Sequence, residues 1–409
     1  MTDLSKAFHS LDRNYFFTPK QIFNKWLTID KHMANNDREL EFNKSDPKLK
    51  LNQSRYVRDL LNNLWVDLKI ITKRDTKWRQ QKFDTFKQTI DQMIDNLQNP
   101  INCKTTKKLV LHLHLKKGGF GYRLHLIAHS LVLAIALNRT LIFSNKPHIR
   151  ENHYIFQKFF EPLSKTCLTA DGYNSTVWSN DKPDIHSYQV IHIGINEKTI
   201  WPSAIPTNIL PILEILSETP LLLYVGQIVK YITRPNSKLW QLLDEFKKKI
   251  LFNKPMVGIH VRRTDKLIND AIYHSLDQYM SYVDAFYDTI DLMNARNSVN
   301  TTAVQRVVYL TTDDPNVWIN EIKSYIQKGY VFKGSFNHTI IANNITKRTD
   351  IMPTLDLLLD VFILSECDYI VCTMSSNVCR LAVELMKSHD INSDYQSLDT
   401  NYYFNRYKI

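Results

Sequence analysis

From residue 256 onward, short apolar runs alternate with segments in which apolar positions recur at helical spacing. The short runs predict buried strands at 256–261, 306–312, 330–333 and 368–372. The longer segments predict helices at about 275–290, 316–327, 354–365 and 377–388. Strands that alternate with helices are typical of a parallel sheet covered on both faces. This part of the chain is therefore predicted to have an α/β fold with a parallel, Rossmann-type sheet.

The pattern before residue 100 is different, because apolar residues recur there at helical spacing without a strand-like run. Two series between Tyr56 and Leu97 predict two helices, and Asn99 with Pro100 ends the second one. Charged residues fill the other faces, so a helical hairpin or a coiled-coil-like stalk is expected. The apolar stripe indicates packing rather than a cofactor site.

Between these two parts, strands and helices are again predicted. A strand is predicted at 109–115, a glycine turn at 116–122 and a helix at 124–137, with further strand-like runs at 141–143 and 190–192. The expected organisation is a helical segment at 1–100, a first α/β lobe at 101–250 and a second α/β lobe at 251–409.

The turn at 116–122 contains three of the nine glycines of the chain. Glycine lets backbone amides approach a ligand closely, and the N-terminus of the helix that follows favours an anion. The turn is therefore compatible with a phosphate or sugar site, and equally with a tight strand-to-helix connection that binds nothing. It matches neither the Walker pattern nor G-x-G-x-x-G.

The composition is that of a globular protein, with 44% hydrophobic residues among 409. No apolar run approaches the length of a membrane span, and no signal peptide opens the sequence. Residues 1–108 carry +8 of the net charge of +11, from 21 Lys and Arg against 13 Asp and Glu. This basic segment lacks zinc-finger spacing and an aromatic RNA-binding signature, so no partner of the nucleic-acid class is expected.

The five cysteines lack the paired C-x-x-C spacing of a zinc site, so no metal site is expected from them. Cys372 and Cys379 lie close in sequence around a Ser-Ser turn. A local disulfide and two buried free thiols both fit that spacing, and the residues alone leave the alternatives open.

Polar residues follow three of the predicted strands. They are Arg262 to Lys266 after the first, Thr311 to Asp314 after the second, and Thr373 with Ser375 and Ser376 after the last. Carboxyl ends of parallel strands meet at one edge of a sheet, where α/β proteins bind ligands. Two adjacent arginines suit phosphate groups, although an isolated charged turn is more often solvated surface. The convergence of three polar strand ends favours a site for an anionic ligand.

A series of motifs resembles the catalytic domain of the eukaryotic α-1,6-fucosyltransferases, glycosyltransferase family 23. In chain order from residue 260 the motifs are HVRRTDK, YMSYVDAF, YLTTDDP, LLDVFILSECDYIVCTMSSNVCRLAVELM and SLDTNYYF. Earlier in the chain KWRQ, LQNP, KKLV, the GFG turn and RTLIF also have counterparts in the family. Order and spacing match over roughly Trp78 to Phe404, and such a set is far more specific than any one motif.

The resemblance implies a two-lobed GT-B fold and an inverting transfer of fucose from GDP-fucose to the innermost GlcNAc of an N-glycan, in the Golgi lumen. Such a reaction needs a base for the acceptor hydroxyl and cations for the departing diphosphate. The sequence contains no Asp-x-Asp, so arginines and a lysine are expected to supply this charge in place of a metal. No cofactor is therefore expected, and GDP-fucose is the donor substrate.

The motif after the first strand supplies the residues expected to be catalytic. By resemblance, Arg262 binds the β-phosphate, Arg263 supports the loop, and Lys266 positions the base and the donor. The base falls at Asp270, where the family carries a glutamate, so this carboxylate is one methylene shorter. Asp265, in the same motif, is expected in the donor site.

Further donor-binding residues follow from the other motifs. His260 and Asp360 are expected at the guanine, although Asp360 also fits the polar face of a helix. Asp313 and Asp314 are expected to divide their roles between capping the next helix and orienting Arg262 or the donor. Ser375 and Ser376 are expected to hold phosphate or fucose, with a helix cap as the alternative. Acceptor contacts are expected from Lys116 and Asn377, where the family tends to have glutamine at the second position.

The chain also departs from the family pattern in three places. Family cysteines around the glycine turn are replaced, which leaves Cys103–Cys167 and Cys372–Cys379 as the disulfides implied by the resemblance and Cys367 free. The donor-contacting tyrosine of the first lobe is not securely found; Tyr154 is nearest, but an ungapped alignment puts Glu151 there. The sequence stops at Ile409, where the family continues into an SH3-like domain.

These departures keep alternative functions open. A catalytically inactive relative that binds GDP or glycan, and a fucosyltransferase with a different acceptor, are the alternatives to core fucosylation of N-glycans. The N-terminal helices are a possible homodimer contact. No signal peptide or membrane anchor is visible in the sequence, so the Golgi location is expected from the resemblance alone.

Overall fold

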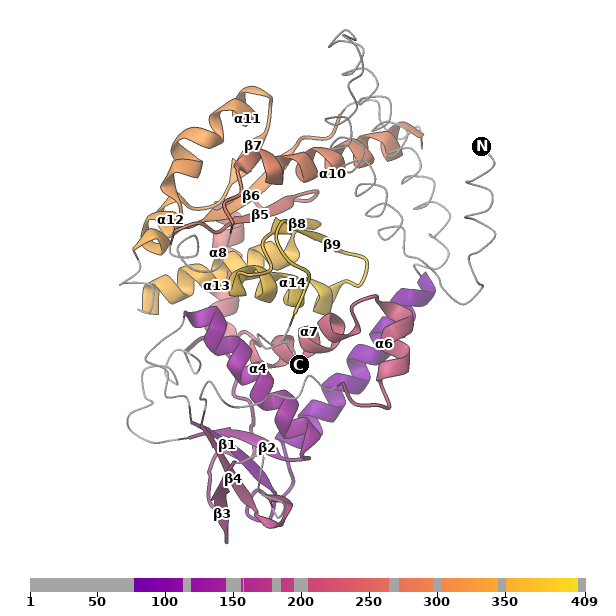
Figure 1. Ribbon diagram of the computed structural model, residues 1–409, viewed down its shortest axis with the longest axis vertical. Helices are drawn as coiled ribbons and strands as arrows, with labels where there is room; N and C mark the ends of the chain where they lie inside the picture. The colour runs from indigo at the N-terminus through magenta and orange to yellow at the C-terminus, as the bar shows by residue number, and fades with distance from the viewer. Residues whose placement is uncertain are drawn as a thin grey trace, which may run out of the picture. The chain divides into compact units, whose positions relative to one another are not determined.

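A computed structural model describes residues 77–112, 119–144, 156, 158–178, 185–194, 205–264, 272–296, 303–344 and 351–403 (Figure 1). The chain forms two compact units, one of Met1–Lys77 with Asp284–Val304 and one of Trp78–Val283 with Gln305–Ile409. In the first unit the described residues include the C-terminal part of helix α10 (Leu276–Arg296). There the amide of Val304 donates to Oδ1 of Asp291 over 2.8 Å. All features below belong to the second unit.

A helix occupies residues 77–98, in the place of the second predicted N-terminal helix. Its buried face consists of Phe83, Phe86, Ile90 and Ile94, which belong to the main hydrophobic core. The helix ends before Pro100, which cannot continue it. The first predicted N-terminal helix lies outside the described residues.

The first sheet has four parallel strands in the order β2-β1-β4-β3. The strands are β1 (Lys108–His112), β2 (Thr140–Phe143), β3 (Ser175–Val177) and β4 (Val190–Gly194). Leu109 and Leu111 alternate with Val110 along β1, and both leucines enter the main core. Strand β3 was not predicted, because it is a three-residue edge strand in which only the middle residue is buried.

Helix α4 (Phe120–Ala136) follows β1 and begins four residues earlier than predicted. Part of the predicted glycine turn is therefore helical. A Cβ atom on Gly121 would approach Cβ of Asn377 to 3.1 Å, so this glycine serves close packing between α4 and helix α14 (Asn377–His389). Gly119 stands at the N-cap of α4, where no side chain caps the helix.

The second sheet has five parallel strands in the order β7-β6-β5-β8-β9. They are β5 (Val257–Val261), β6 (Val307–Thr312), β7 (Val331–Lys333), β8 (Tyr369–Cys372) and β9 (Asp394–Ser397). Four of these strands were predicted. The fifth, β9, has the sequence DYQS at the edge of the sheet, and its polar residues gave no strand signal. Both sheets are wholly parallel, so the α/β fold class is confirmed.

Helices connect the strands of the second sheet. Downstream of β6 the chain forms a π-helical segment (Val317–Glu321), α11 (Lys323–Gln327) and α12 (Phe336–Asn343), and then α13 (Ile351–Glu366) leads into β8. The predicted helix at 316–327 is thus two short helical pieces. Helix α12 was not predicted, because eight residues hold too few turns for a periodic pattern.

The helices α6 (Leu210–Leu216), α7 (Pro220–Ile232) and α8 (Ser237–Lys249) lie between the two sets of strands in the sequence. Helix α7 packs against α14, where a Cβ on Gly226 would come within 2.6 Å of the Glu384 carbonyl oxygen. In the described part of the chain no helix alone has the length and apolarity to span a membrane. Helices α6 and α7 reach that length and apolarity only when they are taken together, and the pair is bent by 108°.

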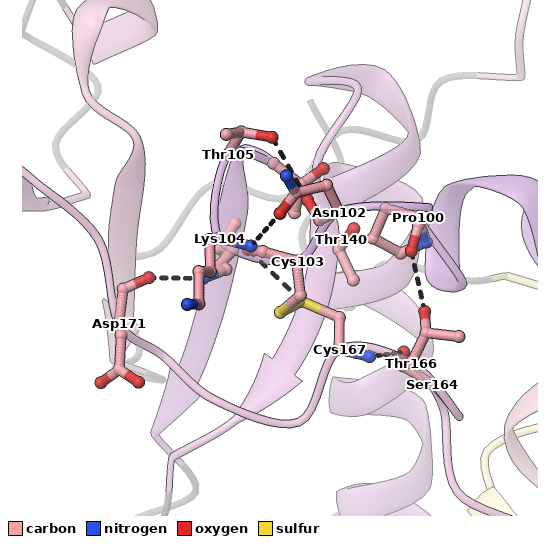
Figure 2. Close-up of a disulfide and its surroundings, with 12 residues drawn as sticks. Pro100, Asn102, Cys103, Lys104, Thr105, Thr140, Ser164, Thr166, Cys167 and Asp171 are labelled. Atoms are coloured by element: carbon pink, nitrogen blue, oxygen red, sulfur yellow. Dashed lines mark hydrogen bonds between the residues drawn. A yellow bond between two sulfur atoms is a disulfide. The ribbon is translucent and has the colours of Figure 1, made fainter.

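Two disulfides are present, and both are the pairs implied by the family resemblance. Cys103 bonds to Cys167, and Cys372 bonds to Cys379. Figure 2 shows the first disulfide, where the amide of Cys167 donates to Oγ of Ser164 over 2.8 Å. Cys367 is free and buried, as expected. The second disulfide spans the turn between β8 and α14, which carries Ser375 and Ser376.

Candidate functional site

The carboxyl ends of β5 and β6 lie level, because Val261 pairs with Thr312 in the parallel register. The two residues that follow the strands, Arg262 and Asp313, form an ion pair directly beyond this edge. Arg262 also donates from an η nitrogen to Oγ1 of Thr264 over 2.9 Å, and the Thr264 hydroxyl donates to the same Asp313 carboxylate. The sequence prediction that these strand ends converge is confirmed.

Arg263 points to different partners from its neighbour. Its guanidinium donates to Asp314 over 3.0 Å, to both carboxylate oxygens of Glu321 and to the carbonyl of His274 over 3.0 Å. It also lies over the ring of Tyr273, 4.5 Å from the centroid. Burial alone would lower the pKa of Arg263, but hydrogen bonds with Glu321 and Asp314 outweigh burial and raise it. These contacts favour a loop-supporting role for this arginine.

Exposure separates the two arginines further. Arg262 keeps 17% of its side chain accessible, against 5% for Arg263. A ligand at the carboxyl edge can therefore reach the first guanidinium, whereas the second is enclosed by protein groups. The resemblance assigned Arg262 to the β-phosphate and Arg263 to support of the loop, but the sequence did not give the exposure of either side chain.

Asp313 and Asp314 have different partners, one in the arginine loop and one at the start of a helix, as the sequence suggested. One Asp314 oxygen accepts the amide of Asn316 over 3.0 Å, at the start of the helical segment after β6, which is the geometry of an N-cap. Asp313 is buried, pairs with Arg262, and accepts the amide of Arg263 over 2.8 Å. Asp314 thus caps a helix, and Asp313 orients the arginine loop.

His260 lies on β5 and is buried. Its Nδ1 is 2.9 Å from Oγ1 of Thr311 on β6, and its Nε2 is 3.2 Å from Oγ of Ser376. Burial, followed by the nearby charge of Arg262, lowers the pKa of His260 to about 3. The imidazole is therefore neutral at physiological pH and can only donate one hydrogen bond and accept another.

Ser376 occupies the N-cap position of α14, but its side chain makes no capping hydrogen bond. Its hydroxyl contacts His260 instead, so the serine joins the turn after β8 to β5. The first amides of a helix carry partial positive charge and bind anions when no side chain caps them. The alternative interpretation of Ser376 as a helix cap is thus wrong.

Asp399, which the sequence analysis did not select, holds the same turn from the other side. One of its carboxylate oxygens accepts the amide of Ser375 over 3.2 Å, and the other accepts the hydroxyl of Ser397 over 2.9 Å. The Ser397 hydroxyl in turn accepts the amide of Met374 over 3.1 Å. The motif SLDTNYYF contains Asp399, and it was the only signal in the sequence.

Asp360 on α13 lies within a polar network on the β6 side of the helix. Its Oδ1 accepts the hydroxyl of Tyr309 over 2.7 Å and lies 3.0 Å from Nδ1 of His338. The carboxylate is only 14% exposed. The interpretation of Asp360 as a merely solvated face of α13 is therefore wrong.

Asn377 begins α14 and contacts helix α4. Its Oδ1 is 3.1 Å from Nδ1 of His125 on α4, and it accepts a hydrogen bond from Arg380. The other nitrogen of His125 is 3.0 Å from the buried carboxylate of Glu384, which also accepts the hydroxyl of Tyr402 over 2.9 Å. Asn377 is therefore held by neighbours on both α4 and α14, a role that its position in the sequence did not reveal.

The remaining predicted site residues lie outside the described residues. They are Lys116, Asp265, Lys266 and Asp270, together with Glu151 and Tyr154. Within the ranges that the structure describes, no three His, Cys, Asp or Glu side chains are grouped so as to hold a metal ion. Metal independence stays a prediction.

Several known proteins are similar to this chain. It matches the family of alpha-(1,6)-fucosyltransferase N- and catalytic domains over residues 17–403. It is 32% identical to a Drosophila melanogaster alpha-(1,6)-fucosyltransferase over 334 residues, which cover 80% of this chain and 51% of the relative. For the Caenorhabditis elegans alpha-(1,6)-fucosyltransferase the identity is 30% over 324 residues, which cover 78% of this chain and 56% of the relative. The chain thus spans about half the length of these relatives.

Among solved structures, a variant of Arabidopsis thaliana FUT1 in complex with GDP is similar with a TM-score of 0.42 and 13% identity, over 75% of this chain and 76% of that one. This likeness is too remote to bear on the site. The family match covers nearly the whole sequence and includes every strand of both sheets. The chain therefore belongs to the alpha-(1,6)-fucosyltransferase family.

Proposed function

We propose that the chain carries the fucose-transfer activity of its family, with GDP-fucose as donor and the innermost GlcNAc of an N-glycan as acceptor in α-1,6 linkage. The observation that carries the proposal is the accessible Arg262, which Asp313 orients at the carboxyl edge of the second sheet. A planar guanidinium there suits the diphosphate of a nucleotide sugar.

In the proposed reaction, the acceptor hydroxyl oxygen attacks the anomeric carbon of fucose and inverts it. The bond from that carbon to the β-phosphate oxygen breaks, and GDP leaves with the electron pair. Asp270 takes the proton of the attacking hydroxyl, and Lys266 positions this base and the donor. Arg262 stabilises the charge that develops on the leaving diphosphate.

The proposal also assigns the ends of the donor. The neutral imidazole of His260 and the carboxylate of Asp360 serve the guanine. Ser375, Ser376 and the uncapped amides at the start of α14 bind phosphate or fucose. Asp265 belongs to the donor site by its motif, and Arg263 supports the loop through Glu321 rather than touching the donor.

The acceptor side is proposed from the family alone. Lys116 and Asn377 are assigned to it, together with a location in the Golgi lumen, a metal-independent reaction and a possible homodimer through the N-terminal helices. The division into a helical segment (1–100) and two lobes (101–250 and 251–409) is part of the same proposal.

A transfer assay tests the activity. The purified chain is incubated with GDP-fucose and a GlcNAc-terminated biantennary N-glycan in the presence of EDTA, and fucose addition is followed by mass spectrometry. We expect product. GDP binding by calorimetry without transfer to this glycan would favour an inactive relative, whereas transfer to another acceptor would keep the chemistry and change the substrate.

Two variants of the proposed base sharpen the assay. Asp270→Asn removes the proton acceptor and is expected to lower transfer by roughly 100-fold or more, the contribution typical of general base catalysis. Asp270→Glu restores the length of the family carboxylate and is expected to retain or increase the rate. Activity that survives Asp270→Asn would place the base at another residue.

A further inference from the structure

A second cluster of ionisable side chains lies beside the proposed guanine position. His338 on α12 is placed between two carboxylates of α13, with Nδ1 at 3.0 Å from Asp360 and Nε2 at 3.3 Å from Asp356. The ring of Phe246 on α8 stacks on the imidazole with 5.2 Å between centroids and 17° between planes. Both ring nitrogens contact carboxylates and the ring plane packs on Phe246, so the imidazole is held in one orientation.

The position of the cluster relates it to the rest of the site. Tyr309 and Thr311 lie two residues apart on β6, so their side chains project from the same face of the sheet. Thr311 contacts His260, and Tyr309 donates its hydroxyl to Asp360. One face of β6 therefore connects the buried histidine of β5 with the carboxylate of α13.

The two oxygens of Asp360 differ in their contacts. Oδ1 takes part in both hydrogen bonds, to the Tyr309 hydroxyl and to His338, which fill its two lone-pair directions. Within the described parts of the chain, no residue hydrogen-bonds Oδ2. Oδ1 thus fixes the orientation of the carboxylate, and Oδ2 can accept hydrogen bonds from the N–H groups of a ligand.

The surroundings of His338 favour its charged form. The carboxylates Asp356 and Asp360 face it from α13, and the ammonium of Lys249 acts from α8 with the opposite effect. Tyr309 lies behind Asp360 on β6, and on α12 itself the His338 amide donates to the Ser335 hydroxyl. Burial alone would lower the pKa of His338, but the hydrogen bond and charge of Asp360 and the charge of Asp356 raise it.

We propose that His338 is a positioning residue for the nucleoside end of the donor: its imidazolium bridges Asp356 and Asp360 and holds the Asp360 carboxylate with Oδ2 directed at the guanine. This inference rests on the proposed nucleotide-sugar function. When His338 loses its proton, one of its two N–H donors disappears and the carboxylates, one helical turn apart, repel each other without a cation between them. The affinity for a nucleoside diphosphate therefore falls as pH rises through the pKa of His338.

Calorimetric titration of the full chain with GDP and with inorganic pyrophosphate, from pH 6 to 9, tests the proposal. For His338→Gln we expect GDP affinity at pH 6.5 to fall roughly 10-fold, in line with the loss of a charge-assisted hydrogen bond, while pyrophosphate affinity stays within 2-fold. The ratio of variant to wild-type affinities cancels the ionisation of the ligand. That ratio should approach one at high pH, where the wild-type imidazole is neutral as well.

Asp356→Asn is the second variant and keeps the histidine in place. It removes one of the carboxylates that hold the proton, so the fall of GDP affinity should begin at lower pH, with little loss at pH 6. The positioning role would be overturned if His338→Gln weakened the binding of GDP and of pyrophosphate equally. It would also be overturned if the wild-type affinity for GDP did not change with pH and His338→Gln had the same affinity. Failure of the wild-type chain to bind either ligand would instead overturn the proposed function.

Discussion

The proposed donor site has two regions that are built from similar residue types and used differently. One is the strand-edge region at the carboxyl ends of β5 and β6, where His260 contacts the hydroxyls of Thr311 and Ser376, and burial lowers the pKa of the imidazole to about 3. The other is the helix region of α12 and α13, where His338 lies between the carboxylates of Asp356 and Asp360, and its pKa is raised. Both imidazoles are largely buried, so the chemistry of the partners decides which one carries a proton.

The adjacent arginines of the strand-edge region also differ in their partners. Arg262 pairs with the carboxylate of Asp313 and remains partly accessible. Arg263 has two carboxylate partners, Asp314 and Glu321, and is enclosed. One guanidinium is available to a ligand, and the other stabilises the loop that presents it.

The largest effect is expected from the accessible arginine. Arg262→Ala should lower kcat/KM for fucose transfer by about 100-fold to 1000-fold, because a preorganised cation at the leaving diphosphate is lost. Arg262→Lys keeps the charge without the planar pair of donors and should lose less. Lys248→Ala, which removes an exposed charge from α8, is the matched control and should be silent. Unchanged transfer by Arg262→Ala would refute the assignment of this loop.

Loss of a partner of the enclosed Arg263 should lower the stability of the fold rather than the rate of transfer. Glu321→Gln leaves the buried Arg263 with one carboxylate fewer and should lower the free energy of unfolding by roughly 2–3 kcal/mol, measured in urea. Transfer at a temperature where the variant is folded should change little. Asp84→Asn, which disrupts an exposed pair with Lys87, is the control and should not shift the urea midpoint. A large loss of donor affinity with normal stability would mean that Arg263 also binds the donor.

The two histidines should have opposite effects on the pH dependence of stability. The pKa of His260 is lowered in the folded state, so protonation favours the unfolded chain and stability falls as pH drops below about 6.5, by about 1.4 kcal/mol for each pH unit. The pKa of His338 is raised, so its contribution is complete below about 6.5 and is lost as pH rises through the folded-state pKa.

Urea unfolding of the wild type, His260→Gln and His338→Gln from pH 4 to 9 separates these contributions. The first variant should reduce the acid slope, and the second should reduce the loss at alkaline pH. NMR titration of the histidine side chains provides the direct measurement. If both imidazoles titrated near 6.5, the contrast between the two regions would be wrong.

The sequence predicted the strand-edge region better than the helix region for a structural reason. Arg262 and Asp313 directly follow apolar runs, and parallel strands place such residues at one edge. His338 lies on a short helix that gave no periodic signal, and its partners are 18 and 22 positions further along the chain. Neither local composition nor spacing specifies that contact.

Two further differences have the same origin. The sequence predicted a glycine turn up to Tyr122, whereas Gly121 already belongs to α4 and packs closely against Asn377 of α14. It also left Ser376 open as a helix cap, whereas the hydroxyl contacts a histidine 116 positions earlier in the chain. In each case a residue from a distant element displaced the locally preferred role.

The sequence by itself determined the alternation of strands and helices, the polar carboxyl edge of the second sheet and the family, and the family resemblance then implied both disulfide pairs. Each of these depends on local periodicity or on motifs that are contiguous in the chain. Only the tertiary structure decided how far each arginine is enclosed, which histidine has a raised pKa and how the first turn of α14 is held by α4. Those properties depend on burial and on partners that folding brings together, and a charge in a protein has no fixed pKa until its neighbours are in place.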